Sequence, residues 1–443
     1  MTAQPNDSGE RFYGWYVVGA LFFAMFLVVG TRQGFGVFVE TWEEEWGVSV
    51  GAISAAASIG WLLNGISQPF YGRLADRIGG RPVVLVSMTV MGFAFIAMAF
   101  VNNVWMLALL YGVIISWAAG GISPSMTGIF VVRWFQRQRG TAMSLLISGG
   151  SVGGLVLIPF LTYLFLATNW QTAWVVAGVL TLVLGVPLLW GIVRSDPSDM
   201  GLHPDGDSDE LMSERAASGV DAVPVGPLDA ARWQDSYHSA PMWQLSTAYV
   251  VCGITTASVA VHFVRWAASE DISPGTAALA FGLLSGINAA SVLFVGAVSD
   301  RMQRKTLLGA MYLIRAVAFL ALIALPGQAA LWTFAIVGGV SWLATVPLTT
   351  SLTADVYGLR HIGMLGGLTL MVHQLGGALA VVLFGFAFDV WGSYDIPFAV
   401  GAVTLVGAGL ISLTIRERHV SARYAPVVRA RPDLDAAPAG GSG

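Results

Sequence analysis

Twelve apolar stretches of bilayer-crossing length dominate this sequence and leave few folds open to it. A helix of about 20 apolar residues spans the hydrocarbon core of a membrane with its backbone polar groups paired internally. Charged residues make up only 11% of the 443 residues, whereas a soluble surface needs about a quarter. We expect an all-α membrane protein with transmembrane helices over residues 14–38, 51–71, 82–101, 104–130, 140–166, 170–192, 242–266, 274–298, 306–325, 329–352, 361–388 and 395–415.

The basic residues sort to one side of these twelve spans. With a cytoplasmic N-terminus, the cytoplasmic segments hold all of the 22 Lys and Arg residues except Arg32, Arg265 and Arg315. The first outer loop instead carries the acidic run 43–45. The positive-inside rule predicts this asymmetry for an even number of helices, so we expect both termini in the cytoplasm.

The chain divides near its middle, at a polar stretch rich in Asp, Ser, Pro and Gly. A repeat supports the division, because Gly-Arg-Leu-Ala-Asp-Arg-Ile-Gly-Gly-Arg at 72–81 returns in weaker form at 296–305. Parallel duplication of a helical unit is one way in which transporters are built. We expect two pseudo-symmetric six-helix bundles, with a cytoplasmic N-terminal tail (1–13), the first bundle (14–192), a cytoplasmic central loop (193–241), the second bundle (242–415) and a disordered cytoplasmic tail (416–443).

The segment 72–81 resembles the loop 2–3 signature of the major facilitator superfamily, and 296–305 resembles its second-half copy. Segments 34–38 and 133–140 are similar to monocarboxylate transporters, and 354–358, 373–377 and 388–394 to their bacterial relatives and to oxalate/formate exchangers. The resemblance covers the chain except the central loop and the tail. It implies the major facilitator fold, alternating access and a bacterial inner-membrane location. Such relatives often carry an Arg in helix 8, but residues 274–298 have none, so no specific carboxylate site is carried over.

The resemblance also implies that the loop at 72–81 latches the cytoplasmic side closed in the outward-facing state. A glycine would give the tight exit from helix 2, and Asp76 would complement a helix N-terminus or a neighbouring Arg. The alternative is that the loop only anchors the topology. The expected gating residues are Gly72, Asp76, Arg77, Arg81, Arg133, Asp300 and Arg301.

Every full charge in the interior of the predicted spans is positive. Polar groups at that depth are costly and usually functional, and transporters of cations usually hold a buried acid. Arg32 lies about 18 residues into helix 1, roughly 9 Å beyond the midplane, and its fork can hold a carboxylate by two hydrogen bonds. The alternative is that Arg32 reaches the outer interface.

For His262, His373 and Arg315 the sequence leaves two interpretations open, a structural role and a role in substrate binding. His262 and His373 are either hydrogen-bonded core residues or protonatable partners of a carboxylate, since histidine titrates near neutral pH. Arg315 is either a packing residue or a substrate ligand. The full set of predicted binding residues is Arg32, Gln33, Tyr111, His262, Asn288, Arg315, His373 and Gln374.

These features predict a secondary transporter of a small mono- or dicarboxylate, working as a monomer by proton symport or anion exchange. An exporter of neutral or hydrophobic compounds is the alternative, favoured by the tryptophans in the spans. The sequence has no Walker loop and no Cys/His cluster at ligand spacing, so we expect no cofactor, no metal and no enzyme activity. The net charge of −4 gives no reason to expect nucleic acid as a partner.

Overall fold

The structure, a computed structural model, describes residues 12–135, 139–207, 226–299, 301–358 and 361–424. Within these ranges every regular element is a helix, and 12 spans are long and apolar enough to cross a membrane. The prediction of an all-α protein with twelve transmembrane helices is therefore confirmed.

The first six spans are built from thirteen helical segments. They are α1 (Gly14–Gln33) with η1 (Gly34–Phe38) and α2 (Val39–Trp46); α3 (Val50–Ile78); α4 (Gly80–Met98); α5 (Val104–Leu107) with η2 (Ala108–Ile115), α6 (Ser116–Gly120) and α7 (Pro124–Trp134); α8 (Arg139–Ala167); and α9 (Trp170–Leu180) with η3 (Thr181–Gly185) and α10 (Val186–Ile192).

Among the described residues, three short helices precede the second half, and the spans follow. The short ones are η4 (Pro197–Met200), η5 (Pro204–Gly206) and η6 (Trp233–His238). The spans are α12 (Ala240–Ser269), α13 (Pro274–Ser299), α14 (Arg304–Ala324), α15 (Gly327–Ser341) with α16 (Thr345–Tyr357), α17 (Ile362–Trp391) and α18 (Asp395–Leu413), after which comes α19 (Glu417–Val420).

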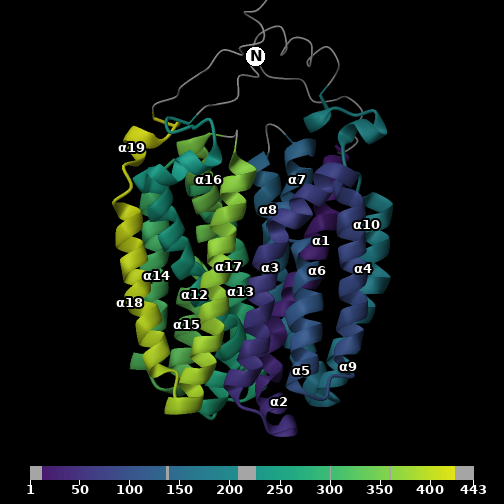
Figure 1. The fold of residues 1–443 in the computed structure, drawn as a ribbon. Coiled ribbons are helices and arrows are strands. Elements are labelled where there is room, and N and C mark those ends of the chain that lie inside the picture. Colours follow the sequence, from purple (N-terminus) through teal and green to yellow (C-terminus); the bar gives the residue numbers. More distant parts are fainter. Residues whose placement is uncertain (1–11, 136–138, 208–225, 300, 359–360, 425–443) are drawn as a thin grey trace, which may run out of the picture.

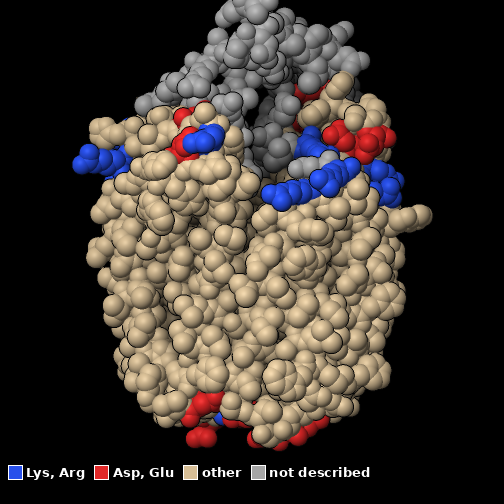
Figure 2. Space-filling view, viewed as in Figure 1, with Lys and Arg blue, Asp and Glu red and all other residues tan. Residues whose placement is uncertain are grey.

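The two sets of helices lie side by side, the first purple to blue and the second teal to yellow (Figure 1). Across their boundary α3 packs along α17, and α8 packs along α13. Most Lys and Arg side chains on the visible face lie at the end near the N-terminus, which we call the basic end (Figure 2). Acidic side chains mark the opposite end, the acidic end, and the surface between is almost free of charge.

The exit from the second span differs from our prediction. We expected the span to end at residue 71, but α3 continues through Gly72 to Ile78. The chain turns at Gly79, whose φ of +85° lies in the region that only glycine adopts without strain. The segment 72–81 is thus mostly helix rather than loop.

Spans 4 and 10, which correspond in the repeat, are both interrupted in the middle. In span 4 the helix breaks between α6 and α7, and the Ser123 hydroxyl accepts from the Met126 amide while Pro124 occupies the first turn. In span 10 the break falls between Ser341 and Thr345. Each interruption frees backbone carbonyls inside the bundle, and these need donors.

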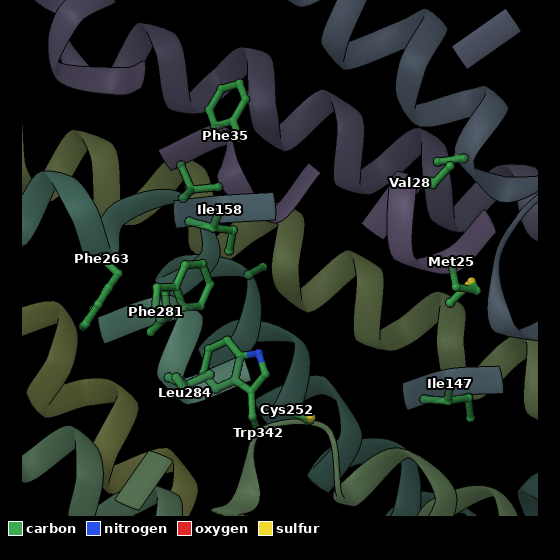
Figure 3. Packing of buried hydrophobic residues seen from close by; sticks show 14 of the residues in the cluster. Met25, Val28, Phe35, Ile147, Ile158, Cys252, Phe263, Phe281, Leu284 and Trp342 are labelled. Atoms are coloured by element: carbon green, nitrogen blue, oxygen red, sulfur yellow. The ribbon is translucent and has the colours of Figure 1, made fainter. Parts of the chain in front are cut away.

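Glycines and aromatic rings set how closely the spans approach. A side-chain carbon at Gly30 would lie 2.6 Å from the carbonyl carbon of Gly153, so α1 and α8 touch backbone to backbone, as small residues allow in membrane helices. In the second half Phe263, Phe281 and Trp342 pack together (Figure 3), with ring centroids 5.8 and 6.3 Å apart.

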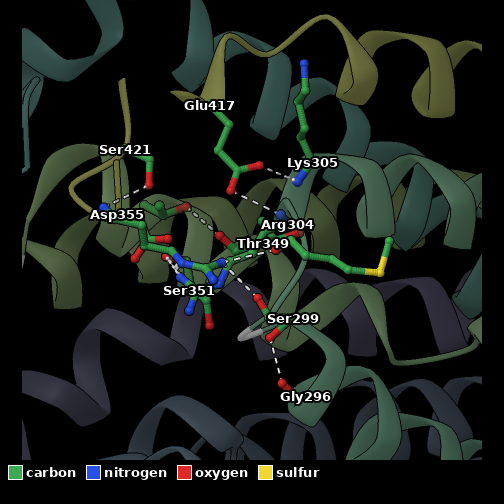
Figure 4. Close-up of polar contacts among 12 residues, drawn as sticks. Gly296, Ser299, Arg304, Lys305, Thr349, Ser351, Asp355, Glu417 and Ser421 are labelled. Atoms are coloured by element: carbon green, nitrogen blue, oxygen red, sulfur yellow. Dashed lines mark hydrogen bonds and ion pairs between the residues drawn. The ribbon is translucent and has the colours of Figure 1, made fainter. Parts of the chain in front are cut away.

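The start of the C-terminal tail is ordered, whereas we expected disorder from residue 416. Glu417, fully buried, accepts from the backbone amides of Arg304 and Lys305 at 3.1 and 2.8 Å (Figure 4). A carboxylate at a helix N-terminus satisfies free amides and complements the helix dipole. In the first half Ser195 plays the corresponding part, since its hydroxyl accepts from the Arg81 amide at 3.1 Å. Residues 425–443 of the predicted tail lie outside the described ranges.

Candidate functional site

Arg32 lies in the last turn of α1 and places a cation inside the first bundle. Its Nη2 reaches the Ser116 hydroxyl only at 3.5 Å. Its Nε is buried and has no hydrogen-bond partner among the described residues. The Tyr111 hydroxyl donates to the Arg32 carbonyl at 3.3 Å, so this predicted residue holds the backbone of Arg32. The guanidinium is therefore only partly satisfied by the protein.

A chain of hydrogen bonds runs from the neighbour of Arg32 into the second half. The Asn64 amide nitrogen donates to the Ser116 carbonyl at 3.1 Å, and the Gln374 amide nitrogen donates to the Asn64 amide oxygen at 2.6 Å. The His373 Nδ1 lies 3.2 Å from the Gln374 amide oxygen. Because Asn64 belongs to α3 and Gln374 to α17, this chain joins the two halves near the middle of both spans.

A second group of polar side chains lies near Gly154, where α1, α8 and α13 meet. A side-chain carbon at Gly154 would lie 2.5 Å from the Ser285 hydroxyl and 2.9 Å from the Gln33 amide oxygen. Both oxygens are buried and lack a hydrogen-bond partner in the described part of the chain. Nearby in sequence, the Ser151 hydroxyl donates to the Asn288 amide oxygen at 3.0 Å. The predicted residues Gln33 and Asn288 thus both lie at contacts between the halves.

His262 is satisfied by the protein itself. Its Nε2 lies 2.9 Å from the Val381 carbonyl, and since a carbonyl only accepts, Nε2 carries the hydrogen. The Tyr394 hydroxyl, 3.2 Å from Nδ1, is then the donor to that nitrogen. Burial raises the pKa of Tyr394, so the hydroxyl keeps its proton. The side chain of His262 is fully buried and has no ring nitrogen left for a substrate in this conformation.

Arg315 is also fully buried, and its donors go to the interrupted span 10. It donates to the carbonyls of Ser341 and Trp342, and to Cys252 Sγ and the Thr255 hydroxyl at 3.3 Å each. The carbonyls freed by the helix break are therefore the partners of this cation, which favours the packing reading of Arg315 over the substrate reading.

The acidic end is tied across the two halves. Arg265 Nε of α12 lies 2.8 Å from Glu43 Oε2 of α2, and the Gly51 amide of α3 donates to Asp389 Oδ2 of α17 at 2.9 Å. The Phe388 ring lies under the Arg265 guanidinium, 4.6 Å away. These contacts close the acidic end in this conformation.

The predicted gating residues lie at the basic end. Arg77 and Arg301 are exposed and Gly72 and Arg133 are half-buried, while Arg81 Nη2 donates to the Trp190 carbonyl at 2.6 Å. Asp300 and the side chain of Asp76 lie outside what the structure describes, so the latch itself stays a prediction.

Two residues of the site were absent from our predicted set. Asn64 and Ser116 link Arg32 to His373, yet neither belongs to a motif. The available signal was an amide side chain in the middle of an apolar span, a position where polar groups are costly unless they are paired or functional.

Comparison with known proteins identifies relatives along most of the chain. A family model described as Major Facilitator Superfamily matches residues 21–381 and 246–436. The uncharacterized MFS-type transporter YcxA of Bacillus subtilis is 25% identical over 411 residues, 89% of this chain and 93% of its own length. Human monocarboxylate transporter 11 is 24% identical over 420 residues, 92% of this chain and 84% of its own.

Two further matches extend this result. The probable sulfoacetate transporter SauU of Cupriavidus necator is 24% identical over 413 residues, 90% of this chain and 93% of its own. A crystal structure of a bacterial homolog to the human lysosomal transporter Spinster, in an inward-facing and occupied conformation, superposes with a TM-score of 0.67 at 15% identity. It covers 96% of this chain and 100% of that one. The predicted resemblance to the superfamily and its monocarboxylate branch is confirmed.

Proposed function

The chain belongs to the major facilitator superfamily, and from this we propose that it carries a small organic anion, a mono- or dicarboxylate, by alternating access. It is a multi-pass membrane protein and a transporter rather than an enzyme. We further propose that it works as a monomer in a bacterial inner membrane, with the basic end and both termini in the cytoplasm. Transport is coupled to protons or to exchange of a second anion.

The observation that carries the proposal is the incomplete pairing of Arg32. A guanidinium taken out of water needs acceptors for its donors. The half-buried guanidinium of Arg32 has a buried Nε without a partner among the described residues, a contact of 3.5 Å from Nη2 to the Ser116 hydroxyl and the Tyr111 side chain beside it. The Nε of Arg315 also lacks a partner in the described part of the chain, but its Nη2 donates to the carbonyls of Ser341 and Trp342, whereas the Nη2 of Arg32 reaches only a hydroxyl. An incoming carboxylate can accept hydrogen bonds from both Nε and Nη2 of Arg32, in the bidentate geometry that arginine favours.

The relatives support the same class of substrate. Two of them are named for a monocarboxylate and for sulfoacetate, which share a carboxylate group. In the described spans, carboxylates such as Glu43 and Asp389 lie at the ends, where they pair with Arg265 and the Gly51 amide. An anion entering the middle of the bundle therefore meets a cation and no opposing acid.

The test is uptake by purified protein in lipid vesicles. A melting-temperature screen with acetate, lactate, pyruvate, oxalate and sulfoacetate first selects the acid that stabilises the protein most, and uptake of that acid is then measured. We expect Arg32→Gln to reduce uptake at least about tenfold, the cost of a lost charge-assisted hydrogen bond. The matched control is Arg232→Gln, which removes an arginine whose side chain is 75% exposed in the central loop. Undiminished uptake by Arg32→Gln would refute the site.

A specific feature favours export of neutral or hydrophobic compounds as the second candidate. An apolar groove of about 470 Å³ lies at α3, α4 and span 4, lined by residues that include Tyr71, Leu74, Ile78 and Trp117. If this groove is the route, cells that produce the protein resist uncharged toxins, and Arg32→Gln leaves that resistance unchanged. Resistance that instead disappears with Arg32 would exclude this candidate.

A further inference from the structure

We propose that His373 carries the proton that accompanies the anion, and that Gln374 and Asn64 are positioning residues that tie its protonation to the anion site at Arg32. The inference rests on the proposed function. It goes further by naming the coupling ion, the atom that holds it and the link between the two sites.

The Ser116 carbonyl, the one backbone group in this chain of hydrogen bonds, determines which group donates and which accepts at every later link. The Ser116 carbonyl only accepts, so the Asn64 side chain turns its NH2 group toward it, at 3.1 Å. The Asn64 oxygen is then left for the Gln374 NH2 group, at 2.6 Å. This leaves the Gln374 oxygen facing His373 Nδ1, at 3.2 Å. Nδ1 must therefore carry a hydrogen and donate it.

With Nδ1 committed as a donor, Nε2 is the atom that gains and loses the proton. It lies 3.4 Å from the Thr256 hydroxyl, which is also 2.8 Å from the Cys252 carbonyl. When that hydroxyl donates to the carbonyl, its oxygen is free to accept from a protonated Nε2. When Nε2 is neutral, the hydroxyl rotates and donates to it. Both protonation states thus find a partner without backbone movement.

The surroundings of His373 hold no carboxylate among the described residues that contact it. From α12 it meets the Tyr249 ring, with centroids 4.8 Å apart, and the Cys252 thiol. Arg315 of α14 lies behind that thiol, and α3 brings only the uncharged Asn64 through Gln374. No described carboxylate therefore neutralises a proton on His373, the Cys252 thiol beside it already has the Arg315 cation as a partner, and the charge that compensates the proton is that of the substrate.

The charge balance of the step is simple. Nε2 of neutral His373 takes one proton from water on one side and becomes imidazolium, while one carboxylate binds at Arg32. After the halves rock, the anion leaves and Nε2 returns the proton to water on the other side. One proton moves with each negative charge, so a monocarboxylate crosses without net charge movement.

Asn64 matters because it fixes the orientation of Gln374. Without Asn64 the Gln374 amide is free to rotate and present its NH2 group to Nδ1, which then accepts instead of donating. That orientation opposes the imidazolium, in which both nitrogens donate. The aligned amides also strengthen one another when the end of the chain is charged, and the last member, Ser116, contacts Arg32. Proton and anion thus favour each other's binding, as linkage requires.

The experiment measures proton uptake when the anion binds. The sodium salt selected by the melting screen is added to weakly buffered purified protein with a pH indicator, and Arg32→Gln supplies the background signal. We expect wild-type protein to take up protons when the anion binds, about half a proton per anion on average between pH 6 and pH 8, which corresponds to an affinity that falls about tenfold over that range, within the usual range of coupled sites. His373→Gln should bind with no proton uptake and a flat pH profile.

Two variants and a control separate positioning from structure. Asn64→Leu should lose most of the proton uptake, and Gln374→Glu should lose it because its carboxylate holds His373 protonated throughout. Ser58→Ala removes another bond between α3 and α17, from the Ser58 hydroxyl to the Ala378 carbonyl at 2.7 Å, and should keep wild-type uptake. Binding without proton uptake in wild type, or uptake retained in His373→Gln, overturns this inference alone. Failure of every acid to bind overturns the proposed function and this inference with it.

Discussion

Arg265 of α12 and Glu43 of α2 form an ion pair between the two halves, with 2.8 Å between Nε and Oε2. The side chains are 14% and 28% exposed, so the pair is partly shielded from water and is worth more than a fully exposed one. The Phe388 ring covers the guanidinium from the second half. Separation of α2 from α12 at the acidic end requires this pair to break.

We therefore expect Glu43→Gln to favour the state that is open at the acidic end. The readout is a cysteine at Ser54, which is fully buried and lies against Gly385 between α3 and α17. A membrane-impermeant maleimide should label Ser54→Cys about five times faster when Glu43→Gln is also present, which corresponds to about 1 kcal/mol of lost pairing. The native Cys252 is buried, so we expect it to react slowly with the maleimide.

A charge reversal provides the control for that result. Glu43→Arg combined with Arg265→Glu should return the labelling rate toward that of Ser54→Cys alone, because the pair is restored with opposite polarity. Asp235→Asn, which breaks the exposed pair with Arg232, should leave the rate unchanged. Equal labelling with and without Glu43→Gln would mean that the pair does not hold the acidic end closed.

Loss of charge should lower the stability of the protein at Arg315 but its transport activity at Arg32. Arg315→Leu leaves two buried carbonyls without donors, so we expect a loss of about 2–4 kcal/mol in stability and a marked fall in melting temperature. Arg32→Leu removes a cation whose Nε has no partner, so its melting temperature should stay within a few degrees of wild type while anion uptake is lost. Similar melting temperatures for the two variants would contradict the assignment of Arg315 to packing.

The sequence was enough to place both arginines within spans but not to tell their roles apart. The partners of Arg315 are carbonyls freed by the interruption of span 10, and residues 342–344 carry no proline or cap signal that marks that break. The matching break in span 4 does carry one, because Ser123 followed by Pro124 is a typical helix start. The number of spans, in contrast, follows from apolar length, which depends on no tertiary contact.

The hydrogen bonds that connect Asn64 to His373 could not be predicted from the sequence, for a different reason. Its members are 310 residues apart at the crossing between Asn64 and Gln374, so no local pattern joins them. Gln374 and His373 were predicted because they lie in the middle of a span. Asn64 occupies the same kind of position in span 2, and a search for every amide at mid-span depth would have included it.

Glu417 gives a prediction about how the tail supports span 9. Glu417→Ala removes both acceptors for the first amides of α14, and we expect a loss of about 1–2 kcal/mol, as for other helix caps. Ser195→Ala is the matched variant in the first half, where a single neutral hydroxyl accepts from the Arg81 amide, and its effect should be smaller. Melting temperatures of the two variants test the ranking, and a larger loss from Ser195→Ala would contradict it.

Gly253 gives the sharpest test of the packing that positions His373. A methyl group there would fall on the His373 carbonyl oxygen, so α12 and α17 must separate in Gly253→Ala, at a cost of about 1–3 kcal/mol. At Gly407 of α18 an added carbon meets nothing within 4 Å, and Gly407→Ala should be neutral or stabilising because alanine favours helix. Since separation moves His373 away from Thr256, Gly253→Ala should also weaken the pH dependence of anion binding. A variant that melts and titrates like wild type would show that these helices are not in the contact described.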